Sequence, residues 1–229
     1  LFRSFDEMEY TFVDLAENPI INVIGKSKTG KTNLLKSIAY TLDKNNVSEK
    51  LQLYLIDSSN FGLHAIKDLQ SVKSYGSSFE ETKDTLLIIN DAIEERTQRQ
   101  TDEILDKGPK FNEKEFLESL PMVTLFIDDI KELLNNIVNQ VELMNILSKV
   151  VSEGKNIGVS MIVAGKEDDF NKNVYLAEFV KQLKGENFGF MLDGVYNQRF
   201  YDIKLKYGEA QKSLQKGDAY FINKEGYQK

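Results

Sequence analysis

The stretch INVIGKSKTGKTNLLKSIAYTL, residues 21–42, constrains the fold more than any other part of the chain. An apolar run leads into a short loop of glycine, lysine and threonine, and apolar residues at helical spacing follow the loop. Within this stretch, Gly25, Gly30, Lys31 and Thr32 satisfy the pattern G-x-x-x-x-G-K-[ST]. Because the pattern lies between a predicted strand and a predicted helix, it predicts a loop that binds a phosphate group.

The chemistry of a phosphate-binding loop explains these residue types. Small residues let successive backbone N–H groups surround a phosphate at the positive end of the following helix. We expect the Lys31 ammonium to contact the β- and γ-phosphates and the Thr32 hydroxyl to bind Mg²⁺, so the predicted cofactors are ATP and Mg²⁺. The predicted nucleotide-binding residues are Gly25, Lys26, Ser27, Lys28, Thr29, Gly30, Lys31, Thr32 and Asn33. The alternative interpretation is a glycine turn with a solvated lysine.

Strand-like and helix-like segments alternate along the chain. The predicted strands are 11–16, 20–25, 51–57, 122–129, 158–165, 187–193 and 217–223. The predicted helices are 32–42, 79–105 and 131–154, with a lysine-rich linker at 106–120. Strands that are apolar throughout and separated by helices predict a parallel sheet with helices on both faces. The 229 residues are therefore expected to form a single α/β domain over 1–229.

Composition excludes several classes of protein. A net charge of −7 argues against a surface built to neutralise nucleic-acid phosphates, although it leaves room for a local basic groove. No apolar run approaches the ~20 residues that a membrane span needs. The absence of cysteine excludes disulfides and thiolate metal sites and suits a cytosolic location. Because the sequence begins with Leu1, we expect a piece of a longer chain whose membrane or targeting segments lie upstream.

Two acids end the predicted strand 122–129. We expect Asp128 to hold Mg²⁺ through a water molecule, as an acid at the carboxyl end of such a strand does. Asp129 occupies the position of the glutamate that commonly polarises the attacking water, and it is one methylene shorter. A general base must come within about 2.6–3.2 Å of its proton, so this shortening predicts slow hydrolysis. The alternative is a helix N-cap with a neighbouring acid.

Several blocks in a fixed order resemble the FtsK/SpoIIIE family of ATPases over residues 11–223. They read FVDLAENPIINVIGKSKTGKTNLLKSIAYTL, YLIDSSNFGL, IEERTQRQ, TLFIDDIKELL, GKNIGVSMIVAGKEDD and LQKGDAYFIN, of which the first is the most specific. Within the family, the chain is most similar to the last ATPase domain of EssC-like coupling proteins of type VII secretion systems.

This resemblance implies a RecA-like P-loop domain with a mostly parallel central sheet. It implies partners as well: other ATPase domains of the same chain, neighbouring subunits, and a secreted helical WXG-type protein or its signal peptide, rather than nucleic acid. It places the domain at the cytoplasmic face of a bacterial cell membrane, attached through a region outside this sequence. A DNA-translocating motor and a non-catalytic binding module on the same fold remain the alternative functions.

The chain departs from the family pattern at three positions. Asp129 replaces the usual glutamate, and Ala164-Gly165-Lys166 replaces an Ala-Thr-Gln block whose glutamine senses the γ-phosphate. Lys166 can contact a phosphate through its charge, but it cannot both donate and accept as an amide does. The segment after Asp57 also lacks the Pro-Lys of many relatives, and Asp57 itself is expected to lie beside the site or to cap a turn. These departures predict nucleotide binding with weakened hydrolysis.

Arginine is scarce, with Arg3, Arg96, Arg99 and Arg199 as its four occurrences. A guanidinium that reaches the γ-phosphate of a neighbouring subunit must come from this set. Arg96 in EERTQRQ matches the ERR helix block of the family and is the predicted finger, with Arg99 as the second candidate. The alternative is an exposed helix arginine paired with Glu95 or with a carboxylate one turn away. The predicted catalytic residues are therefore Asp128, Asp129 and Arg96.

Overall fold

A computed structural model gives the fold of residues 2–3, 10–11, 13–58, 61–173, 178–193, 198–203, 214–215, 217–224 and 226–228. Its centre is an eight-stranded sheet in the order β10-β9-β8-β3-β7-β6-β4-β5. The strands are β3 Ile20–Ile24, β4 Leu51–Ile56, β5 Val72–Gly76, β6 Met122–Asp128, β7 Val159–Gly165, β8 Gly189–Met191, β9 Tyr220–Asn223 and β10 Gly226–Gln228. A separate antiparallel pair joins β1 (Phe2–Arg3) to β2 (Tyr10–Thr11).

The strands from β8 to β5 are parallel to their neighbours, and β9 is antiparallel to both β8 and β10. Strands β3, β6 and β7 are almost fully buried along their length, which explains why their sequences are apolar without alternation. The predicted mostly parallel sheet is confirmed.

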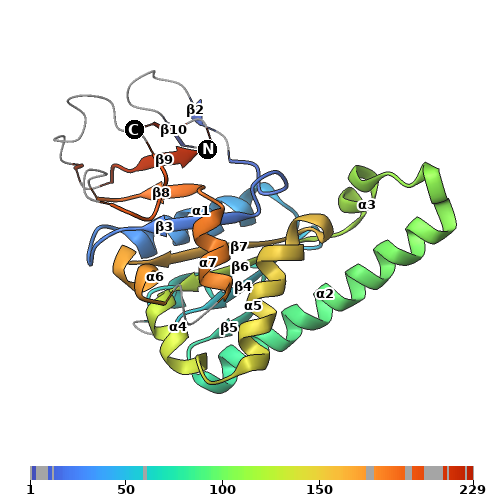
Figure 1. Cartoon of the computed structure of the whole chain (residues 1–229), viewed down its shortest axis with the longest axis horizontal. Helices are drawn as coiled ribbons and strands as arrows, with labels where there is room; N and C mark the ends of the chain where they lie inside the picture. Colours follow the sequence, from blue (N-terminus) through green and yellow to red (C-terminus); the bar gives the residue numbers. More distant parts are fainter. Residues whose placement is uncertain are drawn as a thin grey trace.

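Helices cover both faces of this sheet (Figure 1). The α-helices are α1 Lys31–Asn45, α2 Phe79–Lys107, α3 Glu113–Ser119, α4 Ile130–Ile137, α5 Val141–Glu153, α6 Glu167–Asn173 and α7 Glu178–Gly185, and the 3₁₀ turns are His64–Ile66, Gly108–Lys110 and Gly154–Ile157. Helix α1 buries Leu35, Ile38 and Ala39 in one core cluster, together with the strand residues Ile21 and Val23. Helices α2, α4, α5 and α7 bury their apolar sides in a second cluster on the opposite face.

Helix α2 is the longest element, with 29 residues and a length of about 43 Å. It begins at a capping box, in which the Ser78 side chain accepts from the Glu81 N–H and Glu81 accepts from the backbone N–H of Ser78. Its first half packs on the sheet through Leu86, Ile89 and Ile93. Its second half leaves the body of the molecule and carries α3 at its far end, so that the two form a projecting arm (Figure 1).

The predicted helix 131–154 is wrong as a single element, because the structure has α4 and α5 with a break between them. The break is at residues 138–140, and three asparagines of low helix propensity lie in or just before it: Asn135 and Asn136 in the last turn of α4, and Asn139 in the break. Helix α4 ends with the Val138 N–H bonded to the Leu134 carbonyl, and α5 begins anew at Val141. Each short helix buries its own apolar side.

Three further segments differ from the predicted elements. Residues 13–16 of the predicted strand 11–16 are not in a strand: a turn over 15–17 follows Asp14, whose carboxylate accepts from the Ala16 N–H. The predicted linker 106–120 contains α3, which Asn112 caps through bonds from the Lys114 and Glu115 N–H groups. Strand β5 was not predicted, because its sequence VKSYG is largely polar, as suits a strand at a sheet edge.

Candidate nucleotide-binding site

The phosphate-binding loop connects β3 to α1 at the carboxyl edge of the parallel strands. The Lys31 side chain is buried, and its Nζ donates to the carbonyl oxygens of Gly25 at 2.9 Å and Lys26 at 3.0 Å. The Thr29 hydroxyl donates to the Lys26 carbonyl at 2.9 Å. The loop is therefore closed on itself, with the lysine held inside the curve at the first turn of the helix.

Glycine is required at two positions of this loop. A Cβ atom at Gly25 would lie 2.5 Å from Thr29 Oγ1 and 3.2 Å from Leu192 Cβ. Gly30 has φ +106°, in the region that favours glycine, and the helix starts at the next residue. The backbone can therefore curl closely enough for its N–H groups to surround a phosphate.

Thr32 and Asp128 come together beside the loop. The Thr32 hydroxyl donates to Asp128 Oδ2 at 2.6 Å, although the two residues are 96 positions apart in the sequence. Asp128 is the last residue of β6, and its register with Ala164 of β7 places it at the same edge as the loop. A hydroxyl and a carboxylate are ligand types that Mg²⁺ takes together with waters and phosphate oxygens, so the pair fits the predicted metal. Among the described residues, no group of three or more His, Cys, Asp or Glu side chains offers a metal site made by protein alone.

Burial shifts the titration of the charged groups at this site. Loss of water raises the pKa of Asp128 above its ordinary value, and the hydrogen bond from Thr32 acts in the opposite direction. Burial also lowers the pKa of the Lys31 ammonium, against the attraction of the Asp129 and Asp128 carboxylates. These opposed shifts describe a poorly hydrated site, where charges interact more strongly than on the open surface.

Asp129 serves as the N-cap of α4. Its Oδ1 accepts from the Lys131 N–H at 3.0 Å, and the Asp128–Asp129 peptide bond is cis. Burial raises the pKa of Asp129, and the bond from the Lys131 N–H opposes this shift. The capping interpretation of Asp129 is confirmed, and its role as a general base stays a prediction.

Lys166 follows β7 at the same edge of the sheet. Its backbone N–H donates to Asp169 Oδ2 at 3.3 Å. The pKa of Lys31 is lowered mainly by burial, and repulsion from the positive charge of Lys166 lowers it further. This repulsion indicates that the two ammonium groups are near one another. Its contact with a phosphate stays a prediction.

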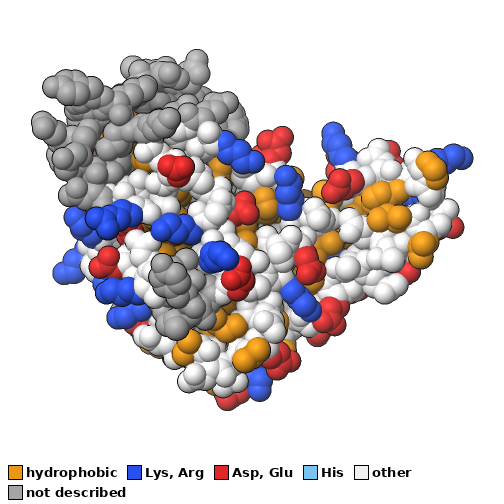
Figure 2. Space-filling model, viewed as in Figure 1, with side chains coloured by type: hydrophobic (Ala, Val, Ile, Leu, Met, Phe, Trp, Pro, Cys, Tyr) orange, Lys and Arg blue, Asp and Glu red, His pale blue; other side chains and the backbone are white. Residues whose placement is uncertain are grey.

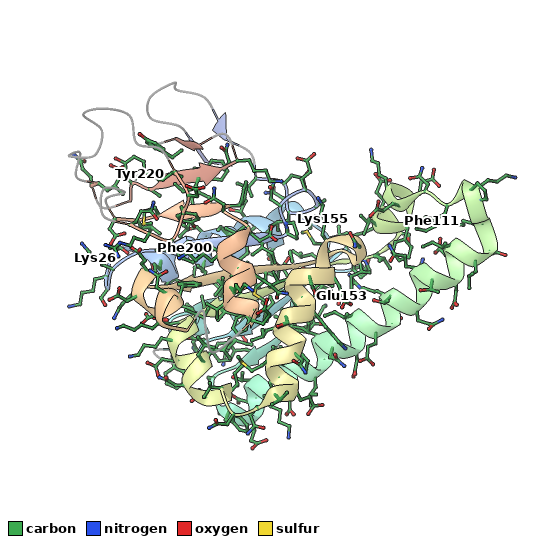
Figure 3. All side chains as sticks on the ribbon, viewed as in Figure 1. Lys26, Phe111, Glu153, Lys155, Phe200 and Tyr220 are labelled. Atoms are coloured by element: carbon green, nitrogen blue, oxygen red, sulfur yellow. The ribbon has the colours of Figure 1, made fainter. Side chains whose placement is uncertain are left out.

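Arg96 lies at the opposite edge of the sheet. Its guanidinium donates to the carbonyl oxygens of Ile157 at 2.9 Å, Gly158 at 3.0 Å and Pro121 at 2.7 Å, and its side chain is buried. Pro121 and Gly158 directly precede β6 and β7, so these contacts are at the amino ends of the strands. Figure 3 shows Lys26 of the phosphate loop at one side of the molecule and Phe111 of the arm at the other.

These contacts contradict the predicted role of Arg96 as a finger for a neighbouring subunit, because its donors are bonded within its own domain. The alternative of an exposed ion pair with Glu95 is wrong too, since Arg96 is 6% exposed and bonds to backbone carbonyls. Arg99 lies on the arm, where it contacts Glu103 at 3.4 Å and Ser119 Oγ at 3.0 Å.

Two acids at the carboxyl edge received no firm role from the sequence. Asp57, directly after β4, is buried and accepts from the Leu63 N–H and the Tyr75 hydroxyl. Asp193, after β8, accepts from the Lys26 N–H of the phosphate loop at 3.2 Å. Both acids end predicted strands, as Asp128 does, and this shared position is the signal that identifies them.

A closed glycine-lysine loop at the carboxyl edge of a parallel sheet, with a Thr–Asp pair beside it, defines a P-loop domain of the nucleoside triphosphate-binding class. The model of the FtsK/SpoIIIE family matches residues 1–182, so the chain belongs to the FtsK/SpoIIIE family. This confirms the resemblance that the sequence blocks indicate.

Among curated proteins, the chain is similar to the type VII secretion system protein EssC of Staphylococcus aureus (strain MRSA252). The two are 28% identical over 155 residues, which is 67% of this chain and 10% of that protein. The chain therefore spans about a tenth of this relative.

Solved structures of related ATPases have the same fold. EssC (ATPases 2 and 3) from Geobacillus thermodenitrificans matches with a TM-score of 0.78 and 17% identity over 99% of this chain and 39% of that one. Thermomonospora curvata EccC (ATPases 2 and 3), in complex with a signal sequence peptide, matches with a TM-score of 0.73 and 19% identity over 99% and 38% of the two chains. A structure of the cytoplasmic domain of EssC gives a TM-score of 0.82 and 17% identity over 99% and 41%. The predicted RecA-like P-loop fold is thereby confirmed. In the part of the chain that the structure describes, no helix is long and apolar enough to cross a membrane.

Proposed function

We propose that this chain is the nucleotide-binding ATPase domain of an EssC-like coupling protein of a type VII secretion system. The observation that carries the proposal is the Thr32–Asp128 hydrogen bond of 2.6 Å beside a closed loop that holds Lys31. Membership of the FtsK/SpoIIIE family and the similarity to S. aureus EssC support the assignment to secretion.

Each residue of the site has a role in this proposal. The backbone of Gly25 to Asn33 surrounds the phosphates of ATP, and Lys31 exchanges its carbonyl acceptors for phosphate oxygens. The Thr32 hydroxyl and the Asp128 carboxylate would hold Mg²⁺. When bound, Mg²⁺ neutralises charge on the β- and γ-phosphates.

We expect hydrolysis to be slow, or to occur when the whole protein is assembled. The Asp129 carboxylate is shorter than glutamate and already accepts the Lys131 N–H, which limits its reach toward a water molecule. Lys166 stands where relatives carry a glutamine, and the Arg96 guanidinium is bonded to carbonyl oxygens of its own domain. A direct test of the first cause is Asp129→Glu in the assembled protein, which should raise the rate of ATP hydrolysis. An unchanged rate would point to Lys166 or to the nucleotide pocket as the cause of slow hydrolysis.

We further propose that the chain is one domain, 1–229, of a longer protein that carries other ATPase domains. Its location would be the cytoplasmic face of the cell membrane, and its cargo a small helical protein with a signal peptide. The signal peptide bound to T. curvata EccC supports this cargo. Figure 2 shows both kinds of charged side chain on this face, with Lys and Arg gathered toward its left side. The net charge of −7 argues against a surface built to neutralise the phosphates of duplex DNA.

Mg-ATP binding tests the nucleotide part of the proposal. ATP at 100 times its dissociation constant should stabilise the wild type by about 2.7 kcal/mol in thermal unfolding, and Lys31→Ala should abolish this gain. Lys44→Ala is the matched control, because Lys44 is an exposed lysine in the last turn of the same helix. Equal stabilisation of wild type and Lys31→Ala would refute the role of the loop. No stabilisation of either would favour a non-catalytic binding module.

Fluorescence anisotropy with two labelled ligands tests the cargo. We expect weak binding of a helical secretion-signal peptide, because ordering a flexible segment costs part of the contact energy. We expect negligible binding of random duplex DNA at physiological salt. Tight DNA binding, with a log–log salt slope of about −0.9 per phosphate contacted, would instead support a DNA-translocating motor.

A further inference from the structure

Asp57 lies beside Asp128 on the same face of the sheet. Strands β4 and β6 are parallel with Ile56 opposite Ile127, so the next residues along the two strands are Asp57 and Asp128. Side chains alternate along a strand, and the preceding residues on this face, Leu55 and Phe126, pack in the core cluster under α1. Both carboxylates therefore face the side of the sheet that carries α1 and its Thr32.

The surroundings of Asp57 are unusual for a carboxylate. It is 1% exposed, and its Oδ2 accepts from the Leu63 N–H at 2.8 Å and the Tyr75 hydroxyl at 3.1 Å. Its Oδ1 is buried and has no hydrogen-bond partner in the described part of the chain. Burying a carboxylate costs free energy that its hydrogen bonds must offset. We therefore look for the role of Asp57 in the groups that it binds.

The segment that Asp57 holds, Phe61–Leu63, lies directly against the predicted metal-binding pair. A Cβ atom at Gly62 would lie 2.6 Å from Thr32 Cγ2 and 3.3 Å from Asp128 Oδ2. Glycine at this position lets the backbone cover the pair at contact distance. Leu63 is fully buried and Phe61 is 64% exposed, so the segment is anchored at one end and open to solvent at the other.

We propose that Asp57 is a positioning residue, which holds the segment Phe61–Leu63 against Thr32 and Asp128 through its bond to the Leu63 N–H. The bond from Tyr75 of β5 fixes the carboxylate in turn. The segment confines the Thr32 hydroxyl and the Asp128 carboxylate to the arrangement that binds Mg²⁺. This last step rests on the proposed function, whereas the holding of the segment does not.

A fluorescence experiment without nucleotide tests the holding of the segment. The chain contains no tryptophan, so Phe61→Trp introduces a single reporter at its exposed end. In this background, Asp57→Ala should increase quenching by acrylamide, and Asp57→Asn should restore protection, since an amide oxygen also accepts the Leu63 N–H. Tyr75→Phe should have a smaller effect, because the bond to Leu63 remains. Asp43→Ala is the matched control, because it removes a similar bond at another place, where the Ser71 N–H donates to the Asp43 carboxylate.

A binding experiment then tests the effect on Mg²⁺. We expect Mg²⁺ to increase the affinity of the wild type for ATP, and Asp57→Ala to reduce this increase about tenfold, the size of one charged hydrogen bond. The affinity for ATP in EDTA should not change, whereas general damage to the fold would weaken both affinities alike. Quenching and Mg²⁺ dependence that stay at wild-type values in folded Asp57→Ala would overturn the proposal. If the wild type binds no ATP, the proposed function fails, and the quenching result still decides the role of Asp57.

Discussion

Replacing Arg96 should destabilise the whole domain. The side chain is buried and donates to three carbonyl oxygens, those of Ile157, Gly158 and Pro121, at 2.7–3.0 Å. Each hydrogen bond to a charged group contributes about 1.5–3 kcal/mol, but the three share one guanidinium and do not add independently. We expect Arg96→Ala to lower the free energy of unfolding by about 3–5 kcal/mol, because it leaves three carbonyl acceptors without their donor and removes the packing of the aliphatic stem.

Urea unfolding followed by circular dichroism measures this loss. Domains are stabilised by about 5–15 kcal/mol in total, so a loss of this size should shift the urea midpoint clearly. Arg96→Met keeps much of the apolar stem but removes every donor, and it should cost nearly as much as Arg96→Ala. The matched control is Arg99→Ala, three residues along the same helix, where the side chain is 46% exposed and the expected loss is below about 1 kcal/mol.

The same experiment separates the structural role of Arg96 from the predicted finger. A finger acts on the nucleotide of a neighbour, so its removal would lower ATP hydrolysis in the assembled protein and leave the stability of the isolated domain unchanged. If Arg96→Ala unfolds at the same urea concentration as Arg99→Ala, the three carbonyl contacts do not stabilise the fold as we infer.

Four further substitutions have defined outcomes. Burial raises the pKa of Asp128, so the folded state favours its neutral form over the charged one. The urea midpoint of Asp128→Asn should therefore lie above that of wild type at pH 7. This difference in midpoint should shrink as the pH falls toward the ordinary pKa of an aspartate, because Asp128 is then neutral in both states. Ser78→Ala should lower the free energy of unfolding by about 1 kcal/mol through loss of the α2 cap. Bonds from Ser77 and Ser78 hold the pKa of Glu81 at about 2, so its charged form stabilises the fold above the ordinary pKa of a glutamate. Wild type loses this stabilisation as the pH falls toward 2. Glu81→Gln should lack it at every pH, which acid unfolding curves of the two proteins would show. Gly189→Ala should cost about 3 kcal/mol or more in the same urea assay, because its φ is +145° and a Cβ atom would collide with the Asn22 carbonyl.

The sequence predicted those parts of the site that local pattern determines. The loop from Gly25 to Thr32 and the strand that ends at Asp128 are read from spacing and apolar character, and the structure brings Thr32 and Asp128 into contact. The central strands were predicted from their continuous apolar runs, and α2 was predicted from its helical spacing of apolar residues. The break between α4 and α5 was missed, since the apolar spacing continues across it and the asparagines are a weaker signal.

The role of Arg96 was predicted wrongly although its position carried a usable signal. Leu86, Ile89, Ile93 and Arg96 follow one another at intervals of three, four and three residues, so Arg96 continues the buried side of α2. An arginine at such a position has to find acceptors inside the fold. The acceptors themselves were not predictable, because they are backbone carbonyls at the starts of β6 and β7, and their approach depends on how α2 crosses the sheet.

Helix α2 connects the edge of the sheet where the nucleotide-binding loop lies to the opposite edge, where Arg96 lies. It follows β5, whose Tyr75 holds Asp57 at the nucleotide edge, and Arg96 binds it to the amino ends of β6 and β7 about 26 Å further along its axis. Beyond Arg96 the helix carries no fully buried residue, and the arm is held by contacts such as that between Arg99 and Ser119. Arg96 is thus the last buried residue of α2, near the point where the helix leaves the body of the domain, and its bonds stabilise the fold although they lie far from the nucleotide.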